Sequence, residues 1–362
     1  MEGKPKICMI VQQPDVKGGI AAVTSGYYGS LLEDTFDITY VESYCDKGVI
    51  PMLIKAFRGL LEFKKVISSQ DIQLVHMHTS FGGSFYRMQP FMNLAIRRGI
   101  PVLDHLHGAD FDSFFVNASS GKKKRIREVY ERFSKIIVLS DEWKEKMSQI
   151  VPSDKLVVLE NYCKPKDKAF VEALYEKRFC NKQVLFLGEL GKRKGGYDFA
   201  GIIKRVLEKE PEAKFMLCGD GDESDVAQIK SDVCKVCSKE KALFPGWVRD
   251  SAKDAVLKES AVFLLPSYNE GLPMAVLDAM AYGLPVVSTN VGGIPQLVDN
   301  GSSGYIAEPG DCDALAEGIC RLLSDKERYH VASNKSLEIA TDKYGFEAHA
   351  RRLAGIYNSL IG

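Results

Sequence analysis

The chain has 362 residues, of which 45% are hydrophobic and 27% are charged, the composition of an ordinary folded protein. Lysine and arginine together number 48, as do aspartate and glutamate. The overall charge therefore gives no support to nucleic-acid binding, and any basic surface must be local. No apolar stretch approaches the roughly 20 residues of a membrane span, and the short run 7–11 is expected to be a first strand, not a signal peptide.

The nine cysteines are scattered along the chain, without the regular spacing of a disulfide framework. An odd number of such cysteines is typical of reduced thiols, so we expect a cytoplasmic protein. Cys234 and Cys237 form the one CxxC motif, but neither a second pair nor suitably spaced histidines complete a zinc site. The sequence therefore predicts no metal there.

In the first half, short apolar or β-branched segments alternate with helical patterns. The expected strands are residues 6–11, 38–42, 73–78, 101–107, 135–140 and 156–160. The expected helices are residues 20–32, 51–68, 84–98, 122–133 and 142–150. This alternation predicts an α/β fold, with a parallel sheet and crossover helices.

The same pattern restarts in the second half, with strands expected at 184–187, 214–218, 242–244, 262–265, 285–289 and 304–307. We therefore predict two Rossmann-like, doubly wound domains facing each other across a cleft, with ligands beyond the carboxyl ends of the strands. The predicted boundaries are 1–163 for the first domain, 164–182 for a linker and 183–340 for the second domain. An amphipathic helix within 341–362 is expected to pack back on the first domain.

Three features of the first half sit where strands are expected to end. Gly18 and Gly19 precede a helix and would let backbone N–H groups approach an anion, although a tight turn is the commoner explanation of an isolated pair of glycines. His105 and His107 share one side of a strand, and His107 precedes a glycine loop, where an imidazole can hold a sugar hydroxyl. His76 and His78 end the preceding strand, yet no metal-binding spacing such as HExxH is present.

Two basic segments raise the question of membrane contact. Residues 121–127 contain five lysines and arginines, and 51–68 combine basic residues with leucines and phenylalanines. Together they could hold the first domain on an anionic membrane. Ordinary amphipathic surface helices are an equally good explanation.

In the second half, Arg193 and Lys194 follow the first strand, where cations could neutralise a diphosphate. Further strand ends carry Gly219 and Asp220, and then Trp247 and Val248, in loops suited to hold a ribose and base by backbone contacts.

The most informative segment follows the strand 262–265. A short loop delivers Glu270 and Gly271, and Leu272 and Pro273 lead into a helix that is expected to end at Gly283. The helix N-terminus is suited to a phosphate. Asp278 lies eight residues beyond Glu270, about 12 Å along a helix, which suits a ligand with hydroxyls at both ends and negative charge between them. A nucleotide-sugar has that form.

With these motifs, nearly the whole chain resembles the retaining glycosyltransferases of family 4, the group 1 glycosyltransferases with a GT-B fold, most of all those of bacterial surface polysaccharides. The resemblance implies that Glu270 contacts donor-sugar hydroxyls and that Asp278, in place of the family's second glutamate, contacts ribose. Lys194 matches the family lysine that binds the diphosphate. Glu189 stands where the family often has arginine, and Arg193 is expected to supply the missing charge. His107 and Gly18-Gly19 match the first-domain histidine and phosphate loop.

The resemblance implies transfer of a hexose from a nucleoside diphosphate sugar, with UDP as the default and GDP open, to a glycan or lipid-linked acceptor. The leaving phosphate would accept the acceptor's proton, so no metal or other cofactor is expected. The protein would be cytoplasmic, with peripheral contact at the inner face of the plasma membrane and no nucleic-acid partner. Two alternatives stay open: an epimerase that turns over donor without acceptor, and a non-catalytic scaffold that only binds sugar-nucleotide.

Overall fold

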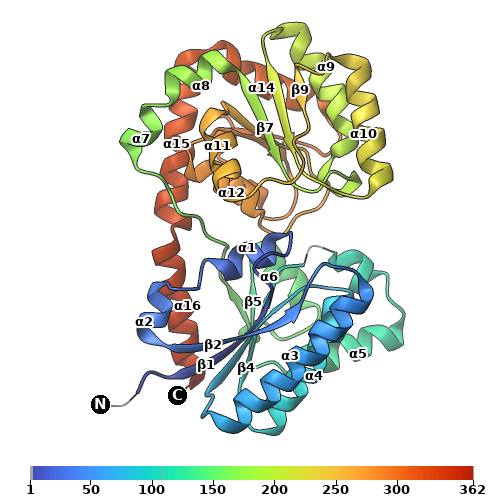
Figure 1. Cartoon of the computed structure of the whole chain (residues 1–362), viewed down its shortest axis with the longest axis vertical. Coiled ribbons are helices and arrows are strands. Elements are labelled where there is room, and N and C mark those ends of the chain that lie inside the picture. Colours follow the sequence, from blue (N-terminus) through green and yellow to red (C-terminus); the bar gives the residue numbers. More distant parts are fainter. Residues whose placement is uncertain (1–2, 109, 362) are drawn as a thin grey trace. The chain divides into compact units, whose positions relative to one another are not determined.

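The structure is a computed structural model that describes residues 3–108 and 110–361. The chain divides into two compact units (Figure 1). The first comprises residues 1–162 and 346–362, and the second comprises residues 163–345. Each unit contains one six-stranded sheet in which all pairs of neighbouring strands are parallel. The predicted α/β class is confirmed in both units.

The sheet of the first unit has the order β2-β1-β3-β4-β5-β6. Its strands are β1 (Lys6–Gln12), β2 (Asp37–Tyr44), β3 (Leu74–Thr79), β4 (Val102–Leu106), β5 (Lys135–Val138) and β6 (Leu156–Val158). The central strands β3 and β4 are buried along their whole length, although they contain histidines as well as apolar residues. The strand order reverses between β1 and β3.

Helices cover both faces of this sheet (Figure 1). They are α1 (Gly19–Ser25), α2 (Leu31–Thr35), α3 (Val49–Ser69), α4 (Gly83–Arg97), α5 (Ser120–Tyr130), α6 (Asp141–Ser148) and α16 (Phe346–Ile361), with short turns η1 (Asp112–Val116) and η2 (Ser153–Lys155). The single helix expected over 20–32 is in fact two, α1 and α2. Gly29, with φ of 62°, lies between them in a left-handed conformation that ends regular helix.

The sheet of the second unit has the order β12-β11-β10-β7-β8-β9. Its strands are β7 (Gln183–Leu187), β8 (Lys214–Cys218), β9 (Ala242–Leu243), β10 (Val262–Leu265), β11 (Val286–Thr289) and β12 (Gly304–Ala307). Counted from β7, this is the strand order 3-2-1-4-5-6 of the Rossmann fold. The order reverses between the neighbouring strands β7 and β10, and this reversal positions the candidate site described below.

The helices of the second unit pack in two groups. Helices α9 (Phe199–Lys209), α10 (Glu223–Val236) and α14 (Cys312–Ser324) pack on one another. The other group is α8 (Tyr175–Asn181), α11 (Asp250–Glu259), α12 (Met274–Ala281) and α15 (Lys326–Tyr344). Shorter segments are α7 (Lys168–Glu172), α13 (Ile294–Leu297), η3 (Lys192–Lys194) and η4 (Gly196–Asp198).

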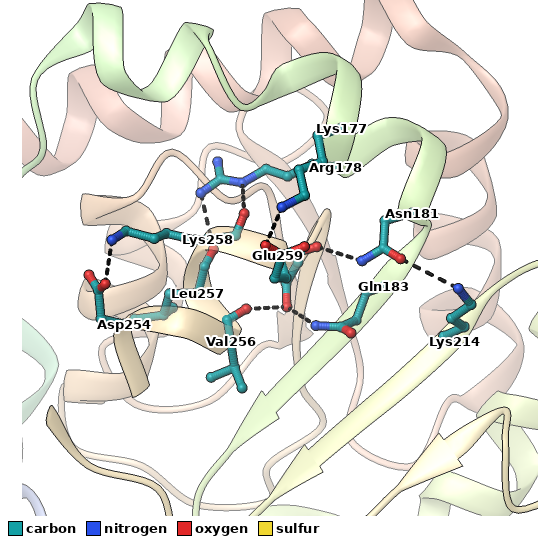
Figure 2. Close-up of polar contacts among 11 residues, drawn as sticks. Lys177, Arg178, Asn181, Gln183, Lys214, Asp254, Val256, Leu257, Lys258 and Glu259 are labelled. Atoms are coloured by element: carbon teal, nitrogen blue, oxygen red, sulfur yellow. Dashed lines mark hydrogen bonds and ion pairs between the residues drawn. The ribbon is translucent and has the colours of Figure 1, made fainter. Parts of the chain in front are cut away.

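The expected linker 164–182 is instead an integral part of the second unit. It contains α7 and α8, and the fully buried Arg178 of α8 fixes it to the end of α11 (Figure 2). The Arg178 guanidinium donates to the backbone carbonyls of Leu257 and Lys258, both at 3.0 Å. These carbonyls belong to the last turn of a helix, where intrahelical donors run out. The arginine therefore caps α11, and a flexible linker is excluded for this segment.

The expected C-terminal segment 341–362 is divided between the two units. Helix α15 continues to Tyr344 and belongs to the second unit, and α16 begins at Phe346 and belongs to the first. Within the first unit, α16 contacts α2 and β3, as the amphipathic pattern of its sequence predicts. The boundary near residue 341 was therefore placed a few residues too early.

Candidate functional site

The reversal of strand order in the second unit brings two polar loops together. Strands β7 and β10 are neighbours, and their following helices leave toward opposite faces of the sheet, which opens a crevice at the strand ends in folds of this type. The loop after β7 carries Arg193 and Lys194, and the loop after β10 carries Glu270. The residues that the sequence predicts as cation and carboxylate thus belong to the two strand ends that ligands favour.

Lys194 and Glu270 form an ion pair at this position. The Lys194 ammonium donates to Oε1 of Glu270 at 2.5 Å, and the two side chains are only 13% and 6% exposed. The hydroxyl of Ser267 donates to the same oxygen at 2.7 Å. The carboxylate is thereby held in one orientation by a cation and a hydroxyl, which offsets the cost of its burial.

Backbone contacts hold the two loops against each other. The Tyr268 N–H donates to the carbonyl of Arg193 at 2.8 Å. Gly195 has φ of 72°, and a Cβ at this position would lie 1.9 Å from the Pro266 carbonyl oxygen. Glycine is therefore required both for the left-handed backbone and for the close approach. This approach is what allows Lys194 to reach Glu270.

Arg193, which the sequence predicts as a diphosphate-binding cation, forms an ion pair with Glu189. Its guanidinium donates to Oε2 of Glu189 at 2.9 Å and to the backbone carbonyl of Asn269 at 3.4 Å. Both side chains of this ion pair are partly exposed, so the interaction is weak and exchangeable. Glu189, which stands where the family often has arginine, is thus neutralised by Arg193.

The segment Gly271-Leu272-Pro273 connects this carboxylate to helix α12. The Gly293 N–H donates to the Gly271 carbonyl at 2.6 Å, Leu272 is buried, and Pro273 is the N-cap residue of α12. Asp278 lies on α12 and forms an ion pair with Lys253 of α11. The sequence does not predict this lysine as a partner, because it precedes Asp278 by 25 residues and no local spacing connects them.

The remaining predicted residues of the second unit follow β8 and β9. A Cβ at Gly219 would lie 1.8 Å from the Gly188 carbonyl oxygen, and the Asp220 carbonyl accepts from the Leu190 N–H at 2.8 Å. The loops after β7 and β8 therefore run side by side. Trp247 and Val248 are half-buried in the connection from β9 to α11.

In the first unit, the two candidate features lie at the ends of β1 and β4. Gly18, with φ of 134°, is the exposed N-cap residue of α1, and Gly19 is its first residue. His107 follows β4, and its backbone N–H donates to the Thr79 carbonyl at 2.8 Å. Its imidazole lies 2.9 Å from that of His78, measured between Nε2 of His107 and Nδ1 of His78.

Buried histidines extend from His107 into the interior of this unit. His76, His78 and His105 are at most 3% exposed, and all three project from the same face of β3 and β4. Burial lowers the pKa of His78 and His105 well below the usual value, and lowers the pKa of His76 and His107 to about 3, with neighbouring imidazoles as a further cause. These rings are therefore neutral at physiological pH. The two His-x-His patterns in the sequence indicate that these side chains share one face of the sheet. They do not indicate the contact of His76 with Tyr357 of α16.

Two family models match the chain, and together they cover most of both units. The model described as "Glycosyltransferase Family 4" matches residues 23–164, and that described as "Glycosyl transferases group 1" matches residues 181–325. The chain belongs to glycosyltransferase family 4. The second match contains Arg193, Lys194, Glu270 and Asp278, so the ion pair of the second unit lies within the region that defines the family.

Among curated relatives, the UDP-Gal:alpha-D-GlcNAc-diphosphoundecaprenol alpha-1,3-galactosyltransferase of Escherichia coli is 28% identical over 83% of this chain and 79% of its own length. Two other curated relatives are matched over smaller shares of their own lengths, 32% in one case and 59% in the other. Among solved structures, sucrose-phosphate synthase from Thermosynechococcus elongatus superposes with a TM-score of 0.81 at 17% identity, covering 99% of both chains. HepE from Anabaena in complex with UDP gives 0.73 at 16% identity, covering 98% of this chain and 100% of HepE. The family 4 glycosyltransferase thus has the predicted GT-B fold of two Rossmann-like domains.

Proposed function

We propose that this glycosyltransferase transfers a hexose from a UDP-sugar to a glycan or lipid-linked acceptor in the synthesis of a cell-surface polysaccharide, with retention of the anomeric configuration. The observation that carries the proposal is the buried Lys194–Glu270 pair at the strand-order reversal of the second unit. The E. coli relative uses UDP-Gal and a diphosphoundecaprenol acceptor, as its name states, and HepE is known in complexes with UDP and UDP-glucose. These relatives support the choice of UDP and of a lipid-linked acceptor.

The two cations act on the departing diphosphate. As the bond between the anomeric carbon and the phosphate oxygen breaks, negative charge accumulates on that oxygen, and Lys194 and Arg193 stabilise it. Lys194 is mostly buried, where a charge interacts more strongly than in water. Arg193 contributes by exchanging its exposed partner Glu189 for phosphate oxygens.

Glu270 orients the donor sugar. Both hydrogen bonds described for this carboxylate use Oε1, and we assign Oε2 to accept from a sugar hydroxyl. Because Lys194 and Ser267 fix the carboxylate, the sugar is positioned without further loss of side-chain freedom. His107 of the first unit is proposed to position the sugar or the acceptor hydroxyl.

The proton balance requires no metal. A bond forms between the acceptor oxygen and the anomeric carbon on the same face from which the diphosphate departs, and the hydroxyl proton passes to the departing phosphate oxygen. The protein supplies the positive charge that a divalent ion supplies elsewhere. We therefore propose that transfer is independent of added Mg²⁺ or Mn²⁺.

The nucleoside is assigned to the loops after β8, β9 and β10. Gly219, Asp220, Trp247 and Val248 are proposed to contact the base and ribose, and Gly271, Leu272 and Pro273 to bring the N-terminus of α12 to the diphosphate. Asp278 is proposed to accept from a ribose hydroxyl, in competition with its ion pair to Lys253. In the first unit, Gly18 and Gly19 are proposed to contact the phosphate side of the donor.

The surface of α3 supports a lipid-linked acceptor. Six large apolar side chains of this helix are 48–71% exposed and, at 100° per residue, fall within an arc of about 140°; they are Val49, Ile50, Leu53, Ile54, Phe57 and Leu61. Exposed basic residues of the same helix are Arg58, Lys64 and Lys65. Among the helices of residues 3–108 and 110–361, none has the length and apolar character of a membrane span. We propose that α3 instead lies on an anionic membrane surface.

In the second basic segment, three cations lie over aromatic rings of the same unit, as in an ordinary amphipathic surface helix. In α5, Lys122 lies over the ring of Phe114 at 5.2 Å, and Lys123 and Arg127 lie over Phe115 at 5.8 and 5.1 Å. These contacts place the basic stems on the aromatic residues of η1, which stabilises the fold. We therefore assign the membrane contact to α3 and not to α5.

Binding of nucleotides by thermal shift tests the proposal. A ligand that binds only the native state raises the melting temperature, and we expect UDP and one UDP-sugar to do so more than GDP and its sugars. Release of UDP only when an acceptor is present identifies a transferase. Conversion of the sugar without acceptor would identify an epimerase, and binding without turnover across acceptors would identify a scaffold. No stabilisation by any nucleotide would overturn the proposal.

A further inference from the structure

Three buried histidines of the first unit, from two neighbouring strands, lie close together. His76 and His78 are two residues apart on β3, and His105 lies on β4, where it is in register with His78. Because side chains alternate along a strand, the three rings share one face of the sheet. One potential ligand atom from each lies within 4.8 Å of the others.

Each of these rings has at least one buried nitrogen without a hydrogen-bond partner among the described residues. For His76 and His78 it is Nε2, and for His105 both nitrogens are in this state. The other nitrogen, Nδ1, of His76 and of His78 has a hydrogen-bond partner outside these three histidines. Nδ1 of His76 lies 2.7 Å from the hydroxyl of Tyr357 on α16, and Nδ1 of His78 lies 2.9 Å from Nε2 of His107.

His76 and His78 thus each have one hydrogen-bonded and one unpartnered nitrogen, which is the pattern of metal-binding imidazoles. A ligating histidine binds the ion through one nitrogen and uses the other N–H in a hydrogen bond that fixes the ring. Buried polar atoms without partners are otherwise rare, because burial removes their hydrogen bonds to water and no other hydrogen bond replaces them. Three imidazoles on one face would satisfy this requirement together by sharing an ion.

We propose that His76, His78 and His105 bind a transition-metal ion, with Zn²⁺ as the preferred ion. Imidazole suits Zn²⁺, Co²⁺, Ni²⁺ and Cu²⁺, whereas Mg²⁺ and Ca²⁺ require oxygen ligands. Zinc binds histidine nitrogen at about 2.0–2.1 Å and accepts three protein ligands with water in the fourth position. The three ligand nitrogens, which lie within 4.8 Å of one another, would have to move closer together to bind the ion at this distance.

The ion would connect β3 and β4 and position residues beyond them. Through His76 it would fix Tyr357, and hence α16, against the sheet. Through His78 it would make Nδ1–H the donor to Nε2 of His107, which sets the tautomer of that ring. The role is structural and positioning. It is independent of the diphosphate-binding cations of the second unit, so its failure would leave the proposed transfer reaction intact.

The test is the metal content of the full-length chain purified without a polyhistidine tag. We expect one ion per chain by inductively coupled plasma mass spectrometry, either as purified or after chelation and reconstitution with Zn²⁺. The reconstituted protein should melt at a higher temperature than the chelated one. Co²⁺ in the same site should give the intense visible bands of a tetrahedral, nitrogen-coordinated ion.

Variants assign the ligands. His105→Asn should lose the ion, whereas the matched control His330→Asn, a half-buried histidine of the second unit, should retain it. Equal metal content in the two variants would overturn the proposal. If His105→Asn does not fold, the Co²⁺ spectrum of the unmodified chain decides. Weak, octahedral bands, or no ion bound after reconstitution, would refute the site and leave buried water as the partner of these rings.

Discussion

The two units share an architecture but differ in how they keep polar groups in their interiors. In the first unit, five of the six histidines of the chain are grouped around one face of the sheet, with four of them buried as neutral rings. In the second unit, the buried residues with charged side chains are Arg178 and Glu270, and Glu270 is paired with Lys194. A neutral ring can be left with one unpartnered nitrogen, whereas a buried charge needs a partner. The first unit can therefore accept a proton or an ion at its neutral rings, whereas the second unit presents fixed charges.

This difference agrees with the roles that we assign to the units. A departing diphosphate requires positive charge that is in place before the reaction, and the second unit holds it there with a buried carboxylate. The first unit instead exposes an apolar helix face and a neutral histidine at a strand end, which suits an uncharged acceptor hydroxyl on a lipid-linked glycan.

The largest expected effect concerns the carboxylate of the second unit. Glu270→Gln should lower kcat/KM for transfer by about 100-fold or more, since a positioned, charge-assisted hydrogen bond to the sugar is lost. UDP release with acceptor measures it. Glu317→Gln, an exposed carboxylate of α14, should leave the rate unchanged. Wild-type turnover in the Glu270 variant would remove this residue from the mechanism.

The buried pair should also differ from an exposed pair in stability. Lys194→Met leaves a carboxylate that is 6% exposed without its cation, and should lower the free energy of unfolding by about 3 kcal/mol. Lys177→Met removes an ion pair to Glu259 whose side chains are 60% and 42% exposed, and should cost less than about 1 kcal/mol. Urea unfolding measures both. Equal losses would show that burial does not distinguish the two pairs.

The first unit should be the more sensitive of the two to acid. Burial lowers the pKa of His349 to about 4, and its hydrogen bond to the Glu160 carbonyl opposes this shift in part. Between about pH 6.5 and pH 4 the unfolded chain therefore binds a proton that the folded chain does not. Stability from this group is complete above pH 6.5 and falls by about 3 kcal/mol as the pH drops to 4.

The measurement uses the two tryptophans, one in each unit. Trp143 is buried in the first unit and Trp247 lies in the second, so a Trp247→Phe chain reports on the first unit alone. In that background, His349→Gln should reduce the fall of stability between pH 6.5 and 4 by about 3 kcal/mol. His76, His78, His105 and His107, whose pKa values burial also lowers, contribute to the fall in both chains. Asp104, whose pKa burial raises to about 7, acts in the opposite sense and is common to both chains. An unchanged slope would contradict the assignment.

The smallest effect concerns the exposed face of α3. Replacing Leu53 and Phe57 by glutamate should weaken binding to vesicles containing phosphatidylglycerol by about tenfold, since apolar burial and charge attraction are both reduced. Val331→Glu alters an equally exposed apolar side chain of the second unit and should have no effect. Sedimentation with vesicles measures binding. Equal binding by all three proteins would place the contact elsewhere than α3.

Local patterns were sufficient to predict the fold and the position of the charged site. Strands of continuous apolar residues have to end where glycine, proline and polar residues begin, and in a parallel sheet all such ends lie along the same edge. The sequence therefore indicated Lys194 and Glu270 as residues of neighbouring strand ends, without any knowledge of their contact. It also predicted nearly all the strands within one or two residues.

Only the tertiary structure decided which distant residues become partners. The register of β3 and β4 brings His105 to His78, and α16 brings Tyr357 to His76. Arg178 fixes the segment 164–182 in the second unit, although its lysines suggested a linker. Periodicity and turn residues act over a few positions, whereas these pairings depend on the packing of whole helices and sheets, which no local pattern encodes.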